Sequence, residues 1–295
     1  MSLAKVEESA MLVELHISQW NPKKEDRRVY PCIVKEFNIG KAAKTAEEIG
    51  VFRKQKITKQ ALQQISDAVS AARSYHYKVT LPWKDGGTRM LPAATLFKYT
   101  KEIRFKKQKF ENAVRSFIDG YPTHLAEAQR KLGGLFDPKE YPTDIQLKRY
   151  YRFSFSLNPI PKGGDFRLKQ VDDRQLKEMA EKYEAEKDMA VANAMGDVWH
   201  RVYEKVSRMA EVLKNEKALL REAVIENVIE MAELLPELNI IQDPELIEIH
   251  KDIRNSLCSN SRNTLKDNPF TRKEQGLKAE QIADKMSIYM GGNVQ

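Results

Sequence analysis

The sequence has little cysteine and lacks the local motifs of common catalytic and metal sites. Only Cys32 and Cys258 are present, far apart and outside any CxxC spacing, so neither a disulfide framework nor a zinc site is indicated. No GxSxG, HExxH or GxGxxG motif occurs. The single Gly-Lys pair, at Gly40, is followed by alanine and lacks the earlier glycine that a phosphate-binding P-loop needs. We therefore expect no cofactor.

Long apolar runs are also missing. No run approaches the roughly 20 residues that would span a bilayer. The N-terminal stretch MSLAKVEESAM carries two glutamates and lacks the apolar centre of a signal peptide. Together with the scarcity of cysteine, these absences predict a cytoplasmic protein with no membrane partner.

Charge is abundant and unevenly distributed. Residues 1–171 hold 32 Lys/Arg against 18 Asp/Glu, a net +14, whereas residues 172–295 hold 18 against 24, a net −6. This asymmetry predicts two domains, a basic α+β domain over 1–171 and an acidic helical domain over 172–295. A basic domain favours a polyanionic partner such as nucleic acid.

Hydrophobic periodicity predicts an α+β fold, mostly helical, with a small antiparallel β-sheet in the N-terminal part and a long-helix hairpin in the C-terminal part. Strands are predicted at 13–17 and 151–157, where apolar and polar residues alternate, with a return strand beginning at 166–168. Residues 23–56 give no clear pattern. Helices are predicted at 58–77, 94–119, 123–132, 172–215, 217–235 and 245–257, with a last one that ends at 291–292.

The long helix at 172–215 carries an apolar seam with three-four spacing over three heptads. It consists of Ala192, Met195, Trp199, Val202, Val206, Met209 and Leu213. Two alternatives follow: a homo-oligomer that forms through this seam, or a helical hairpin that packs it within one chain.

Asp197, His200 and Glu204 come closest to a metal-ligand set. Their spacing of three and four places them on one side of the long helix. Carboxylate-bridged metal bundles need matching ligands from partner helices, and no matching motif is present. A solvated helix flank with an i,i+4 ion pair is the favoured interpretation, so no metal is expected.

Three surfaces are candidates for phosphate contact. The segment KEIRFKKQKF brings together Lys101, Arg104, Lys106, Lys107 and Lys109; its alternative is a solvated helix face. The predicted hairpin carries Arg152, Arg167 and Lys169, but its aromatic residues alternate toward the core, which argues against base stacking. The loop KDGGTR offers Lys84 and Arg89 above aromatic residues that are expected mainly to fill a core.

The runs LVELHISQW, ISDAVSAARSYHYKVTLPWKDGGTRMLPAATLFKY, GLFDPKEYP and FSLNPIPKGGDFRL resemble a family of hypothetical proteins of tailed bacteriophages, plasmids and prophages, a domain of unknown function. The resemblance extends to the tryptophan-containing helix with SRMAEVL. It implies a phage or mobile-element protein in the host cytoplasm, among replication, recombination or host-takeover genes. It implies no reaction and no catalytic residues.

These patterns predict a non-enzymatic protein that contacts nucleic-acid phosphates and is accessory to phage DNA metabolism. The alternative is a protein-interaction or assembly module that acts through the C-terminal helical hairpin without nucleic acid. An enzyme ranks third, because it would need a site assembled from residues distant in sequence, such as His76, Asp85 and Asp197.

Overall fold

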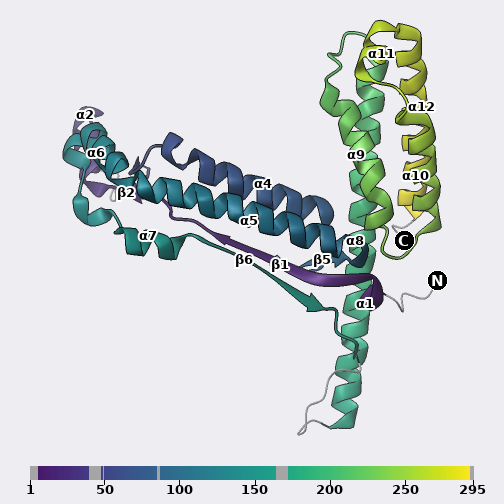
Figure 1. The fold of residues 1–295 in the computed structure, drawn as a ribbon, viewed down its shortest axis with the longest axis horizontal. Coiled ribbons are helices and arrows are strands. Elements are labelled where there is room, and N and C mark those ends of the chain that lie inside the picture. Colours follow the sequence, from purple (N-terminus) through teal and green to yellow (C-terminus); the bar gives the residue numbers. More distant parts are fainter. Residues whose placement is uncertain (1–5, 40–47, 49, 85–86, 164–171, 293–295) are drawn as a thin grey trace. The chain divides into compact units, whose positions relative to one another are not determined.

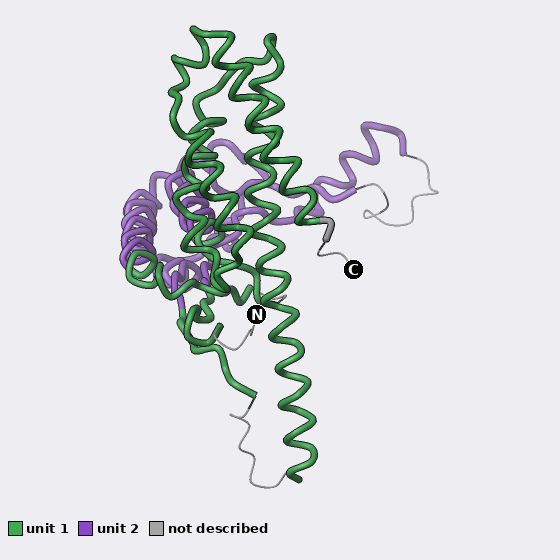
Figure 2. Tube along the Cα trace, turned by 90° about the vertical axis from the view of Figure 1, so that its right-hand side faces the viewer, with its two compact units in different colours: residues 1–14, 76–100, 156–295 green, residues 15–75, 101–155 purple. Residues whose placement is uncertain are grey.

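The computed structural model describes residues 6–39, 48, 50–84, 87–163 and 172–292. The chain forms two compact units, coloured separately in Figure 2. Unit 1 comprises residues 1–14, 76–100 and 156–295, and unit 2 comprises residues 15–75 and 101–155. Each unit is built from segments that are separated in the sequence. The predicted domains, 1–171 and 172–295, instead divide the chain at a single point, and they stay a prediction about independently folding domains.

A small antiparallel sheet near the N-terminus makes the fold α+β, as the sequence predicts. Its strand order is β4-β5-β1-β6, with bounds Leu81–Pro82 for β4, Arg89–Pro92 for β5, Ala10–Ser18 for β1 and Arg152–Pro159 for β6. In its register Ala10 lies opposite Pro92 and Leu81 lies opposite Met90. The predicted return strand at 166–168 lies outside the described residues.

The stretch without a clear pattern contains a second, two-stranded sheet. Here β2 (Lys23–Glu25) pairs antiparallel with β3 (Arg53–Gln55), and helix α2 (Tyr30–Glu36) lies between them in sequence. A short helix, α1 (Val6–Ser9), precedes β1. Strands of three residues are too short for alternation to stand out, which is why the sequence pattern did not reveal them.

Unit 2 is built on parts of two helices that run side by side, α4 (Gln63–Val79) and α5 (Leu96–Asp119) (Figure 1). The Thr58 hydroxyl accepts a hydrogen bond from the Ala61 amide at 3.3 Å. A 3-10 helix over Gln60–Leu62 follows and leads into α4, so α4 begins later than predicted. Helices α6 (Tyr121–Leu132) and α7 (Asp144–Tyr150) complete the unit.

The core of unit 2 is aromatic. Phe110 of α5 lies 5.6 Å from Phe153 of β6, measured between ring centroids, and Phe117 lies 6.1 Å from Tyr151. Centroid distances in this range are typical of favourable edge and offset aromatic contacts. These rings fix which face of α5 is turned inward and which remains for solvent.

Unit 1 contains the C-terminal helices, which run alongside one another in Figure 1. Their bounds are Asp173–Lys214 for α8, Glu222–Leu238 for α9, Pro244–Leu257 for α10, Arg262–Asp267 for α11 and Pro269–Gly292 for α12. Helix α9 begins five residues later than predicted, because a turn follows α8: the Ala218 amide bonds to the Asn215 carbonyl. In the described parts of the chain, no helix combines the length and the apolarity needed to cross a bilayer.

The apolar seam of α8 is covered by its own chain. Six of its seven residues are buried: Met195, Trp199, Val202, Val206, Met209 and Leu213, and α8 packs against α9 and α12. Ala192, the first residue of the predicted seam, is exposed. The Trp199 ring lies 5.7 Å from the Tyr289 ring, and its indole nitrogen donates to Asp243 at 3.2 Å. The intramolecular alternative therefore accounts for these residues, and a homo-oligomer would need a different surface.

Candidate nucleic-acid interface

The two compact units differ strongly in charge. Unit 2 holds 24 Lys/Arg against 13 Asp/Glu, a net +11, whereas unit 1 holds 26 against 29, a net −3. The loop with Lys84 and Arg89 belongs to unit 1. The positive excess of unit 2 is smaller than that of residues 1–171, but fewer residues carry it. Polyanion attraction is therefore expected at unit 2.

Helix α5 presents five cations within nine residues of unit 2. Ile103, Phe110 and Phe117 recur every seven residues and are buried. On a helix, positions seven residues apart share a face, so the opposite face is left for solvent. Lys101, Arg104 and Lys109 are exposed there, while Lys106 and Lys107 are half-buried at its edges.

The five cations of α5 differ in how far they are already engaged. The Lys107 ammonium lies 3.8 Å from Glu111 one turn away. The Lys106 ammonium lies 5.0 Å from the centre of the Tyr75 ring, and the Lys109 ammonium lies 4.6 Å from that of Phe105. Exposed contacts of both kinds are worth about 1 kcal/mol or less, so a phosphate can displace them.

Lys101 and Arg104 are the least engaged members of the group. Both are exposed, and neither forms an ion pair with any residue that the structure describes. An exposed cation without a carboxylate partner gains most from a phosphate, because it has no existing ion pair to give up. These two residues form the centre of the candidate interface.

Lys84 and Arg89, by contrast, are bonded within unit 1. The Lys84 ammonium lies 3.0 Å from a carboxylate oxygen of Glu186. The Arg89 guanidinium donates to the hydroxyl and the carbonyl of Thr80, at 2.6 and 2.9 Å, and lies 4.8 Å from the Tyr77 ring centre. Burial lowers the pKa of Arg89. Arg89 is a structural residue at the start of β5, and a phosphate contact would cost it these bonds.

The predicted hairpin surface is only partly described. Arg152 is exposed, and its side chain donates to the Arg149 carbonyl at 3.2 Å, while Arg167 and Lys169 lie outside the described residues. Tyr151 and Phe153 are buried, as their alternation predicted. These rings therefore offer no stacking face for bases at this surface.

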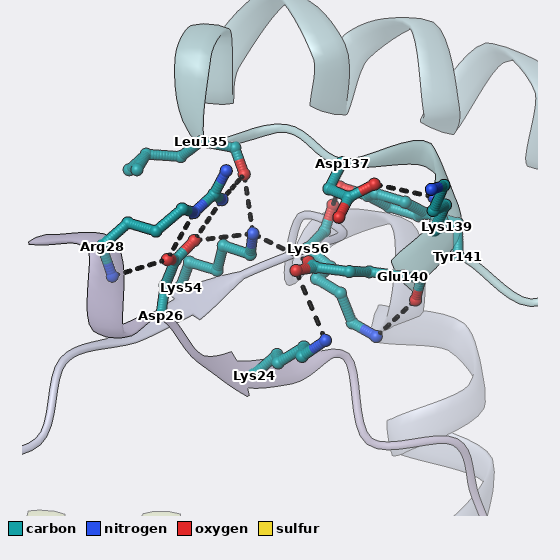
Figure 3. A network of polar contacts seen from close by, with 10 residues as sticks. All are labelled: Lys24, Asp26, Arg28, Lys54, Lys56, Leu135, Asp137, Lys139, Glu140 and Tyr141. Atoms are coloured by element: carbon teal, nitrogen blue, oxygen red, sulfur yellow. Dashed lines mark hydrogen bonds and ion pairs between the residues drawn. The ribbon is translucent and has the colours of Figure 1, made fainter.

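A buried network of charges stabilises the side of unit 2 where β2 and β3 pair (Figure 3). The Lys54 ammonium lies 2.8 Å from Asp26 and 2.7 Å from Glu140, and it donates to the Leu135 carbonyl at 2.6 Å. Arg28 adds a bidentate contact to Asp26. The network joins strand residues to a segment more than eighty residues later in sequence.

The network shifts the titration of its members. Hydrogen bonds from Arg28 and Lys54 hold the pKa of Asp26 far below its usual range. Burial alone would lower the pKa of Lys54, but its hydrogen bonds to Asp26 and Glu140 raise it above the usual value. Both shifts favour the charged forms of Asp26 and Lys54, which pair with each other.

Lys56 is a buried cation of another kind. Its ammonium donates to the Glu140 carbonyl at 3.0 Å and lies 4.8 Å from the centre of the Trp20 ring. Burial lowers its pKa. Lys54 and Lys56 therefore contribute to the positive charge of unit 2 without reaching its surface.

The residues considered for metal binding or catalysis are otherwise engaged. Asp197 pairs with Arg201 at 2.6 Å, and His200 lies 3.4 Å from Glu204, the i,i+4 pair that the favoured interpretation predicted. His76 is buried with its Nδ1 2.9 Å from the Tyr99 hydroxyl, while Asp85 lies outside the described residues. Among the described residues no cluster of three histidine, cysteine or carboxylate side chains has metal-binding geometry.

The buried network went unnoticed in the sequence because lysines on a short basic strand are usually solvated. The pairing of Lys54 with Glu140 depends on tertiary structure, and no local pattern predicts it.

Comparison of the chain with protein-family models, with curated proteins and with solved structures finds no match. Function must therefore be argued from the geometry of the residues themselves.

Proposed function

We propose that the protein contacts nucleic-acid phosphates through the outward face of α5, without catalysing a reaction. The observation that carries this proposal is the pair of exposed cations without ion-pair partners, Lys101 and Arg104, on a unit with a net charge of +11. Lys106, Lys107 and Lys109 add weaker contacts. Lys84 and Arg89, grouped with them from sequence, are left out because they belong to unit 1, whose net charge is −3, and because Arg89 is also bonded to Thr80.

This proposal implies binding without sequence preference. Lysine and arginine contacts to phosphate position a protein on nucleic acid but read no bases. The resemblance to phage and mobile-element proteins supports a role accessory to phage DNA metabolism in the host cytoplasm. Such binding is dominated by counterion release, so its affinity depends steeply on salt.

The test is fluorescence anisotropy of labelled DNA titrated with the protein at several salt concentrations. The triple variant K101E/R104E/K109E should bind at least tenfold more weakly and show a shallower slope of log affinity against log salt, by about 2–3. A matched control, R174E/K177E/K182E on the exposed start of α8, makes the same change in net charge. Equal binding and equal slopes for wild type and the α5 variant would refute the proposal.

A protein-interaction module is the second candidate. Leu219, between α8 and α9, and Phe270, at the start of α12, are 73% and 78% exposed, although both side chains are large and apolar. A partner that covered these two side chains would gain the stabilisation that burial of apolar surface provides. A protein that binds no DNA at low salt but co-purifies with one partner, and loses it in L219S/F270S, would favour this function.

A further inference from the structure

Phe105 lies in the middle of the cationic face of α5. It follows Lys101 by four residues and precedes Lys109 by four, and residues four apart are neighbours on a helix face. Its side chain is 50% exposed, whereas Phe110 and Phe117 of the same helix are buried. The face thus alternates cation, aromatic ring and cation at intervals of about 6 Å along the helix axis.

The position of Phe105 has no packing explanation comparable to that of its neighbours. An aromatic ring left in water forfeits the stabilisation that burial would provide. The contact that the structure gives this ring is with Lys109, whose ammonium lies 4.6 Å from its centre. A cation–π contact at an exposed site is weaker than the stacking of a nucleobase on an aromatic ring. A base can therefore take the place of the ammonium, which is then free for a phosphate.

We propose that the α5 face binds single-stranded nucleic acid, with Phe105 as the platform for one base and with Lys101, Arg104 and Lys109 on the adjoining backbone. This inference rests on the phosphate contact proposed above and names the substrate class of the same site. In a duplex the base faces are covered by neighbouring base pairs, so a protruding ring has nothing to stack on. Unpaired bases present their faces freely, and ring stacking tolerates any base.

The charge of the face supports nucleic acid rather than a protein partner. From residue 101 to residue 109, no exposed residue is a carboxylate. The exposed residues are Lys101, Arg104, Phe105, Gln108 and Lys109. A protein partner would have to be acidic and would gain no particular advantage from a ring flanked by cations. Single-strand binders combine these two features, a basic track and aromatic platforms.

The experiment compares the affinity of wild type, F105L and F105W for a labelled single-stranded 20-mer without self-complementarity and for its duplex. Leucine keeps apolar bulk on the helix but removes the ring face, while tryptophan keeps a stacking surface. F105L should lose about 5- to 150-fold in affinity for the single strand, the range set by about 1–3 kcal/mol per stacked base. Its duplex affinity and its salt slope should be unchanged, and F105W should bind the single strand like wild type.

F270L is the matched control, since Phe270 is also an exposed phenylalanine but lies on α12. Circular dichroism checks that each variant is folded. If F105L binds the single strand like wild type, or loses single strand and duplex equally, the stacking inference is wrong while phosphate contact stands. If wild type binds neither single strand nor duplex at low salt, both proposals are wrong. Both are also wrong if this face binds only an acidic protein.

Discussion

Replacing Asp26 with asparagine should destabilise the protein strongly, because it leaves a buried ammonium short of one carboxylate. Asp26 and Lys54 are both almost fully buried, and the side chain of Lys54 is only 1% exposed. Arg28, whose side chain is half-exposed, can turn to water when its partner is neutralised. Lys54 is buried and cannot turn to water, so the loss of stability comes from its contact with Asp26.

The magnitude follows from what Lys54 keeps. Breaking a buried ion pair typically costs about 3–5 kcal/mol. Lys54 retains Glu140 at 2.7 Å and the Leu135 carbonyl at 2.6 Å, so we expect the lower end, about 3 kcal/mol. With a urea dependence of about 1–3 kcal/mol per molar, the unfolding midpoint of D26N should fall by roughly 1–3 M.

Urea unfolding followed by circular dichroism measures this change. The neighbouring control is E25Q: Glu25 pairs with Arg27 at 2.9 Å in an exposed position, and its loss should cost less than about 0.5 kcal/mol. The double variant D26N/K54M should lose less stability than the sum of the losses in D26N and K54M, because each single change already removes the Asp26–Lys54 contact. A loss below about 1 kcal/mol for D26N, or a double variant that equals the sum of the singles, would refute the reasoning.

The pH dependence gives a further check on Asp26. Its pKa in the folded state lies below the ordinary value of about 3.9, so its contribution is fully present above that value. The contribution is lost as the pH falls from about 4 toward the lower folded pKa. The stability difference between wild type and D26N should therefore shrink in acid.

Two other predictions concern unit 1. Burial, with a smaller contribution from a neighbouring arginine, lowers the pKa of His76 to about 4. Its stabilising contribution is therefore present above the unfolded pKa of about 6.5 and is lost as the pH falls toward 4. H76Q should flatten the change in urea midpoint between these pH values, and an unchanged profile would show that His76 does not cause it. G276A should destabilise the protein by about 1 kcal/mol, because a Cβ at this position would lie 3.1 Å from the Cβ of Leu213 on α8. G196A lies in an open part of α8 and should stabilise the protein by up to about 1 kcal/mol. Thermal melts that rank the two variants in the opposite order would contradict this packing.

Helices and the longer strands could be predicted from sequence because their signals are local. The alternation around Val13 and the buried spacing of Ile103, Phe110 and Phe117 depend only on the periods of strand and helix. Prolines and glycines at the element ends added further local information. The cationic segment of α5 was visible for the same reason, since five basic residues in nine must expose some of their charges.

The partners of those elements could not be predicted. The seam of α8 reads equally well as an oligomer surface or as an internal face, and the arrangement of α9 and α12 decided between them. The charges of Lys54 and Lys56 look solvated in sequence, yet the chain from 135 to 141 returns to bury them. Lys84 and Arg89 look free in sequence, yet residues up to about a hundred positions away bind them.

The sequence by itself thus determined the fold class, the helical faces and the excess of positive charge, because each depends on residue type and short-range spacing. The tertiary structure alone decided which charges are neutralised and which remain for a ligand, because ion pairing depends on which distant segments meet. It also placed Phe105 in water between two lysines while the similar residues Phe110 and Phe117 entered the core. Helical periodicity divides α5 into two faces and predicts the buried one, but only the tertiary structure shows that Phe110 packs there against β6.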